Sequence, residues 1–143
     1  MRILIVSVLA AIASVLAALS AEHLTRPVSV VGNFLQLTLS YNPGIAFGLS
    51  IPYPLQEILI AIALCVMLIL AFKAKHDRFS SLAFGLIIGG AVGNLIDRIP
   101  DGLVTDYLSV GTFPIFNVAD ACITVGAGIL VMQSMRKKSI ISQ

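Results

Sequence analysis

Four long apolar stretches alternate with shorter polar segments along the chain. The stretches cover residues 3–21, 55–72, 79–99 and 115–135. Each is close to the ~20 residues that a helix needs to cross a hydrocarbon core about 30 Å thick. The pattern predicts an all-α integral membrane protein in which residues 1–143 form a single membrane domain with four transmembrane helices.

The first stretch also has features of a cleaved signal peptide, because Arg2 precedes it and small residues lie near Ala21. Its apolar run is longer than the roughly 7–15 residues usual for a signal peptide. We favour a retained transmembrane helix and keep cleavage as the alternative.

Basic residues set the expected orientation in the membrane. Seven of the nine lie before the first stretch, between the second and the third, or after the fourth: Arg2, Lys73, Lys75, Arg78, Arg136, Lys137 and Lys138. Because cytoplasmic segments are enriched in lysine and arginine, we expect both termini to be cytoplasmic. Residues 22–54 and 100–114 then lie outside the membrane, at the face where most acidic residues gather: Glu22, Glu57, Asp97, Asp101 and Asp106.

The two outer segments carry strand and turn patterns. Residues 35–41, LQLTLSY, alternate apolar and polar side chains, which is typical of a strand with one buried face. The turn residues Asn42-Pro43-Gly44 follow it, and Pro100-Asp101-Gly102 precedes a second β-rich run, LVTDYLSV. The sequence therefore predicts a small extracytoplasmic β-platform made from both outer segments.

The composition agrees with a membrane location and excludes several chemistries. Hydrophobic residues make up 58% of the chain and charged residues 11%, against about 25% charged in soluble domains. A net charge of +2 is too small to indicate nucleic acid as a partner. Cys65 and Cys122 lie inside apolar runs, so we expect buried thiols, no disulfide and no metal. His23 and His76 are predicted on opposite sides of the membrane, which argues against a His–His metal site, and no cofactor is expected.

Glycines and polar residues follow helical spacing in the third stretch. Gly85, Gly89 and Gly93 recur every four residues, a spacing that lets two helix backbones approach closely. Asn94 and Arg98 share a face near the outer end, whereas the neighbouring Asp97 points elsewhere. Arg98 either reaches the lipid headgroups or holds its charge over a polar site.

Two aspartates are the candidate catalytic residues. Asp120 shares a stripe with Asn117 and Thr124 at the start of the fourth stretch, where a carboxylate either interacts with the helix dipole or faces a polar cavity. Only 13 residues separate it from Asp106, so both carboxyls can meet at the outer rim. In such a pair one pKa rises and a proton is shared, which suits general acid–base catalysis with a water.

Two other classes of protein remain as alternatives. A small transporter or proton-relay subunit would also use acidic and amide residues within the membrane, although it needs polar groups at intermediate depths. A structural scaffold explains the glycines but not the two aspartates.

Four motifs stand in order along the chain: YNPGIAFG (41–48), GGAVGNLIDR (89–98), GLVTDY (102–107) and FPIFNVADACI (113–123). Together they resemble the motifs of lipoprotein signal peptidase (signal peptidase II), the bacterial prolipoprotein aspartic peptidase family. The resemblance implies a catalytic dyad of Asp106 and Asp120. It also implies a set of residues that surround the site and position the substrate: Asn42, Gly44, Asn94, Arg98, Asn117 and Ala119.

The resemblance also implies the substrate and the location. The substrate is a prolipoprotein whose cysteine carries diacylglycerol, and a water cleaves the chain just before that cysteine. The enzyme lies in the bacterial inner membrane in contact with lipid, with its site at the extracytoplasmic face below a β-cradle that corresponds to the predicted platform. We expect a monomer.

Two features depart from the family pattern. Residues 22–26 read Glu-His-Leu-Thr-Arg where the family often has Asp-x-x-Thr/Ser-Lys, so the charges agree but the side-chain lengths differ. The connection between the two aspartates is also shorter than in many members, which predicts a smaller flap over the site or a different substrate range.

Overall fold

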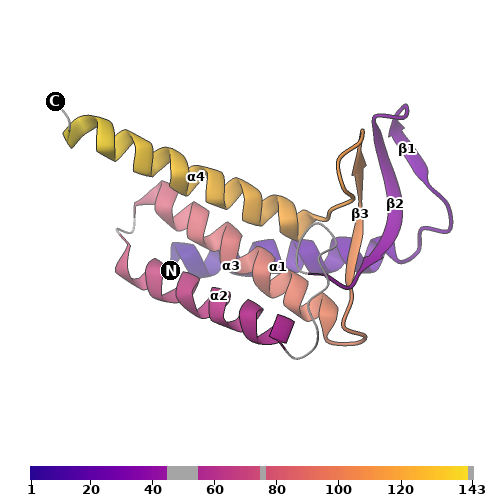
Figure 1. Cartoon of the computed structure of the whole chain (residues 1–143), viewed down its shortest axis with the longest axis horizontal. Coiled ribbons are helices and arrows are strands. Elements are labelled where there is room, and N and C mark those ends of the chain that lie inside the picture. Colours follow the sequence, from indigo (N-terminus) through magenta and orange to yellow (C-terminus); the bar gives the residue numbers. More distant parts are fainter. Residues whose placement is uncertain (45–54, 75–76, 142–143) are drawn as a thin grey trace.

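The computed structural model describes residues 1–44, 55–74 and 77–141, and within these ranges the chain forms four helices and one sheet. The helices are α1 (Arg2–Ala21), α2 (Leu55–Lys73), α3 (Arg78–Arg98) and α4 (Val118–Ile141), and the strands are β1 (Val28–Val31), β2 (Leu35–Asn42) and β3 (Val104–Val110). The sheet lies at one end of the helices, whereas α1 begins and α4 ends at the opposite end (Figure 1).

The helix bounds are close to the apolar stretches, with one difference in α4. Helices α1, α2 and α3 begin and end within one residue of the predicted spans, but α4 begins at Val118 rather than 115 and continues to Ile141. Helices α1, α3 and the Val118–Arg136 part of α4 are long and apolar enough to cross a membrane. The apolar part of α2, Ile58–Lys73, is shorter than the other three, so the fourth transmembrane helix remains a prediction.

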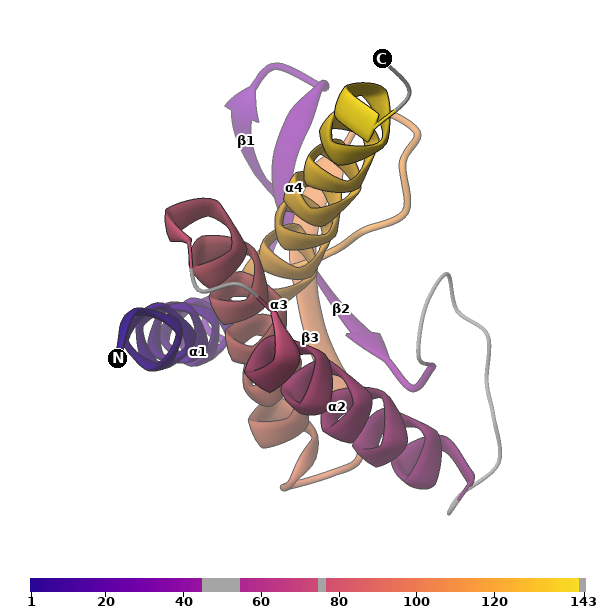
Figure 2. The same ribbon diagram turned by 90° about the vertical axis from the view of Figure 1, so that its left-hand side faces the viewer.

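Helix α3 is the centre of the helical layer. It lies between α2 and α4, which diverge on either side of it, and it packs along α1 (Figures 1 and 2). A Cβ added to Gly85 would lie 2.5 Å from the Cβ of Val6, and one added to Gly93 would lie 2.7 Å from the Cβ of Ser14. The predicted role of the glycine spacing in close helix packing is therefore confirmed.

The sheet is antiparallel with strand order β1-β2-β3. The predicted alternation at residues 35–41 corresponds to β2, and the second β-rich run corresponds to β3, with the turn before it closed by Gly102 at φ 80°. The short strand β1 was not predicted. The register pairs Ser40 with Asp106, so the end of β2 lies beside the first candidate aspartate.

The prediction that both cysteines are buried is wrong. Cys65 is exposed and Cys122 is half-buried, and both are free thiols. Cys65 lies on α2, which packs mainly against α3 and leaves apolar side chains such as Ile62 and Ile69 exposed. A helix that faces lipid tails exposes apolar residues without contact with water, so an apolar run does not indicate burial inside the protein.

Candidate active site

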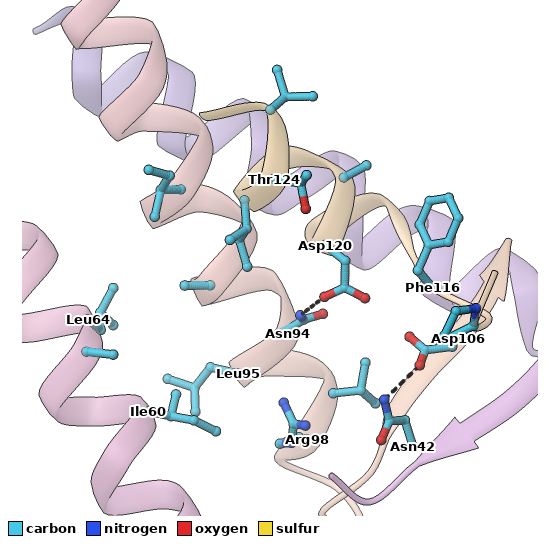
Figure 3. Close-up of a pocket in the computed structure, with 18 of the residues that line it drawn as sticks. Asn42, Ile60, Leu64, Asn94, Leu95, Arg98, Asp106, Phe116, Asp120 and Thr124 are labelled. Carbon is cyan, nitrogen blue, oxygen red and sulfur yellow. Dashed lines mark hydrogen bonds between the residues drawn. The ribbon is translucent and has the colours of Figure 1, made fainter. Parts of the chain in front are cut away.

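A cavity of about 890 Å³ lies between α2, α3, α4 and the ends of β2 and β3. Most of its wall is apolar, with side chains such as Leu59, Leu64 and Ile123. Its polar end is lined by Asn42, Asn94, Arg98, Asp106 and Asp120. The carboxyl groups of Asp106, from β3, and Asp120, from α4, both point into this end (Figure 3).

Asp106 is held in a buried position by two amides. It is 3% exposed, its Oδ2 accepts a hydrogen bond from Asn42 Nδ2 at 2.9 Å, and its Oδ1 accepts one from Asn117 Nδ2 at 2.8 Å. The pKa of Asp106 is raised from 3.8 to about 6: burial is the main cause, the charge of Asp120 adds to the rise, and the two amides and Arg98 oppose it. The predicted rise of one pKa agrees with this direction, but burial rather than repulsion is its main cause.

Asp120 lies in the first turn of α4 and forms a reciprocal cap with Asn117. The backbone N–H of Asp120 donates to Asn117 Oδ1 at 2.9 Å, and the backbone N–H of Asn117 is 3.4 Å from Asp120 Oδ2. Such a capping box satisfies two backbone donors that a helix start leaves free. Asp120 also faces the cavity. Its position at the helix start and its position at a polar cavity, given as alternatives from the sequence, therefore occur together. The N-x-x-D pattern at 117–120 is a signal of this cap that the sequence analysis did not use.

Amide groups join the two carboxyls. Asn94 Nδ2 donates to Asp120 Oδ1 at 2.9 Å, and Asn117 Nδ2 lies 3.1 Å from Asn94 Oδ1 as well as 2.8 Å from Asp106 Oδ1. With the contacts above, each of the four carboxyl oxygens accepts one N–H group. An oxygen has room for a second partner, so a water or a substrate group can still bind to either carboxyl.

The remaining residues predicted for the site differ in how close they lie to the cavity. Arg98 points to its polar end (Figure 3) and donates to the backbone carbonyl of Gly44, whose N–H in turn donates to Asn42 Oδ1 at 2.8 Å. Gly44 therefore supports the site without lining the cavity. Ala119 is 2% exposed and packs against α3, since a Cβ on Gly90 would lie 2.5 Å from the Ala119 carbonyl oxygen.

The chain between the two aspartates is closed by backbone hydrogen bonds. Phe116 O accepts from Tyr107 N at 3.0 Å and from Leu108 N at 2.7 Å, and Phe116 N donates to Leu108 O at 3.1 Å. The Tyr107 hydroxyl accepts from Val118 N at 3.3 Å, and burial raises the pKa of this tyrosine. Tyr107 thus ties the start of α4 to β3, a role that the sequence analysis did not assign.

Among the residues placed by the structure, no group of three or more His, Cys, Asp or Glu side chains is arranged to hold a metal ion. His76, which the sequence analysis placed at the inner side, lies outside the described residues.

The fold and the cavity define a class: a helical membrane protein with two carboxylic acids at the sheet end of an apolar cavity. The family model described as signal peptidase (SPase) II matches residues 3–136. The chain is 36% identical over 125 residues to a lipoprotein signal peptidase of Chlorobium luteolum, covering 78% of this chain and 75% of the relative. It is 40% identical over 122 residues to one of Aquifex aeolicus, covering 79% and 73%.

Two solved structures superpose on this chain over most of its length. A bacterial membrane enzyme superposes with a TM-score of 0.88 at 27% identity, over 96% of this chain and 89% of the other. A second solved structure of a bacterial membrane enzyme superposes with a TM-score of 0.82 at 26% identity, over 92% of this chain and 90% of the other. The chain belongs to the signal peptidase II family and is a membrane peptidase.

Proposed function

We propose that this peptidase removes the signal peptide from diacylglyceryl-modified prolipoproteins by cleaving just before the lipidated cysteine. Relatives named lipoprotein signal peptidase support the substrate class. The observation that carries the proposal is the position of Asp106 and Asp120 at the polar end of an otherwise apolar cavity. A signal peptide is an apolar segment, and it would lie along the wall formed by α2 and α4 with its last residues at the two carboxyls.

In the proposed mechanism the two aspartates act as a pair. One ionised carboxylate takes a proton from a water, whose oxygen forms a bond to the scissile carbonyl carbon. The other carboxyl, protonated, hydrogen-bonds the carbonyl oxygen and then gives its proton to the leaving nitrogen as the C–N bond breaks. The raised pKa of Asp106 supports a pair that keeps its proton to a higher pH than an ordinary aspartate does, and the pair titrates as a unit.

The surrounding polar groups orient the substrate and the dyad. Asn94, Asn117 and Asn42 hold the carboxyl oxygens. Arg98, which binds the Gly44 carbonyl, lies where it can bind a substrate carbonyl. Ala119 would permit α4 to sit against α3 so that Asp120 reaches the cavity. The apolar wall raises the strength of electrostatic interactions at the dyad.

The proposed location is the bacterial inner membrane, with α2 as the fourth transmembrane helix. Lys73, Arg78 and Arg136 lie at the helix ends remote from the sheet, which supports a cytoplasmic position for both termini. The sheet and the dyad then lie at the extracytoplasmic face, where translocated precursors arrive.

The test is cleavage by purified protein, followed as a shift in precursor mobility on a gel. We expect Asp106→Asn and Asp120→Asn each to reduce turnover of a diacylglyceryl-modified precursor by about 10²–10⁴-fold or more, with both variants inserted and folded. An unmodified precursor is the control and should stay uncut. Near-full turnover by either variant would refute the proposed catalytic dyad. Equal cleavage of both precursors would refute the proposed requirement for the lipid modification.

A further inference from the structure

Within the described part of the chain, the strand that carries Asp106 has one edge without a partner strand. There β3 pairs with β2 and with no other strand, and in an antiparallel strand successive N–H groups point to opposite edges. On the open edge, Thr105 N donates to Asp97 Oδ2 at 2.6 Å, and Tyr107 N donates to Phe116 O at 3.0 Å. The backbone is therefore fastened immediately before and immediately after Asp106.

The anchor before Asp106 comes from α3. The two oxygens of Asp97 meet the N–H and the hydroxyl of Thr105, the second contact at 3.3 Å, and Thr105 is 4% exposed. Asp97 lies in the last turn of α3, where the helix dipole disfavours a carboxylate. A buried backbone N–H without a partner costs more than this unfavourable helix position, so the contact with Thr105 accounts for an acid at this place.

The same helix end holds the other carboxyl. Asn94, one turn before Asp97, donates to Asp120 Oδ1. The last two turns of α3 thus fix Asp120 through Asn94 and the backbone beside Asp106 through Asp97, so both carboxyls are placed from one end of one helix.

We propose that Asp97 is a positioning residue that sets the place of Asp106 relative to Asp120. It does not line the cavity and acts through both the backbone N–H and the hydroxyl of Thr105, so its position matters and its charge does not. The inference rests on the proposed catalytic role of Asp106. Displacement of a reacting group by about 1 Å costs up to about 10²-fold in rate.

The test compares Asp97→Ala with Asp97→Asn. Alanine removes both contacts to Thr105, whereas asparagine keeps an acceptor for the N–H and can donate to the hydroxyl. We expect kcat for the modified precursor to fall at least about tenfold in Asp97→Ala with KM within about threefold, because the cavity wall is intact. Asp97→Asn should recover more than half of the parent kcat.

Asp101→Ala is the matched control, since Asp101 Oδ1 also accepts a backbone N–H, that of Leu103 at 2.9 Å, in the same connection. It should leave kcat within about twofold. If Asp97→Ala does not fold, Thr105→Val replaces it, because valine keeps the strand and removes only the hydroxyl contact; a smaller fall in kcat at constant KM is then expected.

Three outcomes would overturn the positioning role: parental kcat in Asp97→Ala, parental kcat in Thr105→Val where that variant is used, or an Asp97→Asn as slow as Asp97→Ala. Asp106→Asn is measured alongside. An inactive Asp106→Asn with a fully active Asp97→Ala refutes this inference alone, whereas an active Asp106→Asn refutes the proposed dyad.

Discussion

Asp106 should make the folded protein less stable as the pH rises from about 4 to about 6. The pKa of this carboxyl is about 6 in the folded protein against an ordinary 3.8, so the folded state binds the proton more tightly than the unfolded chain does. Between these values the folded state holds more protons, and the free energy of unfolding falls with rising pH. The contribution of Asp106 to the free energy of unfolding is fully present below the unfolded-state pKa and is lost above the folded-state pKa.

The magnitude follows from the two pKa values. A tenfold change in proton affinity corresponds to about 1.4 kcal/mol, which gives an upper limit of about 3 kcal/mol. Because the carboxyl faces an open cavity, screening by solvent lowers this figure, and we expect about 1–2 kcal/mol. For a chain of 143 residues that corresponds to a change in Tm of about 3–6 °C.

The assay is thermal unfolding of the purified protein in detergent micelles from pH 4 to pH 8. Asp106→Asn cannot titrate, so its Tm relative to the parent protein should rise through pH 4–6 and then stay constant. Asp101→Asn, which removes an exposed acid from the same connection, should show no such rise. If the difference between Asp106→Asn and the parent is flat over the whole range, or falls with pH, Asp106 does not bind its proton more tightly in the folded state.

Three further substitutions, two of them paired with a control, test the geometry around the cavity. Gly90→Ala places a Cβ 2.5 Å from an α4 carbonyl oxygen and should lower the rate of precursor cleavage about tenfold or more. In the control Gly128→Ala the added Cβ points into open space, and the cleavage rate should stay unchanged. Equal cleavage rates in the two variants would contradict the close packing at Gly90. Asn117→Ser keeps a capping hydroxyl, so the free energy of unfolding should stay within about 1 kcal/mol of the parent value. The rate of cleavage should fall, because the amide that donates to Asp106 is lost. A parental rate would show that this amide is dispensable. Ala63→Phe narrows the cavity and should raise KM with little change in kcat. The control Val66→Phe, on the same helix but outside the cavity wall, should leave KM unchanged. Similar KM values in the two variants would exclude this wall as the binding surface.

Much of the fold follows from periodicity. Runs of apolar residues place the helices, alternation places β2, and glycines at every fourth residue place the α1–α3 contact. The start of α4 was set too early because Ile115 and Phe116 are apolar, while the chain there still pairs with β3. The cap at Asn117, and not hydropathy, decides where that helix begins.

The site was predictable where it depends on short separations in the chain. The turn after α3 and the 13-residue connection bring Asp106 and Asp120 to one end of the bundle. The roles of Asp97 and Tyr107 depend instead on which edge of β3 is open, and that is fixed by the strand order. No local pattern carries this information.

Amide side chains donate hydrogen bonds to both carboxyls of the proposed dyad. A lysine or arginine bonded to each carboxyl would lower both pKa values and keep both groups ionised, which leaves no proton for the leaving nitrogen. Asn42, Asn94 and Asn117 orient the carboxyl oxygens through neutral N–H groups, which fixes the geometry. The hydrogen bonds from Asn42 and Asn117 lower the pKa of Asp106, but each does so less than burial raises it. Arg98 lowers the pKa of Asp106 less than burial raises it. The site therefore combines fixed orientation with an exchangeable proton, which is what the proposed acid–base hydrolysis by Asp106 and Asp120 requires.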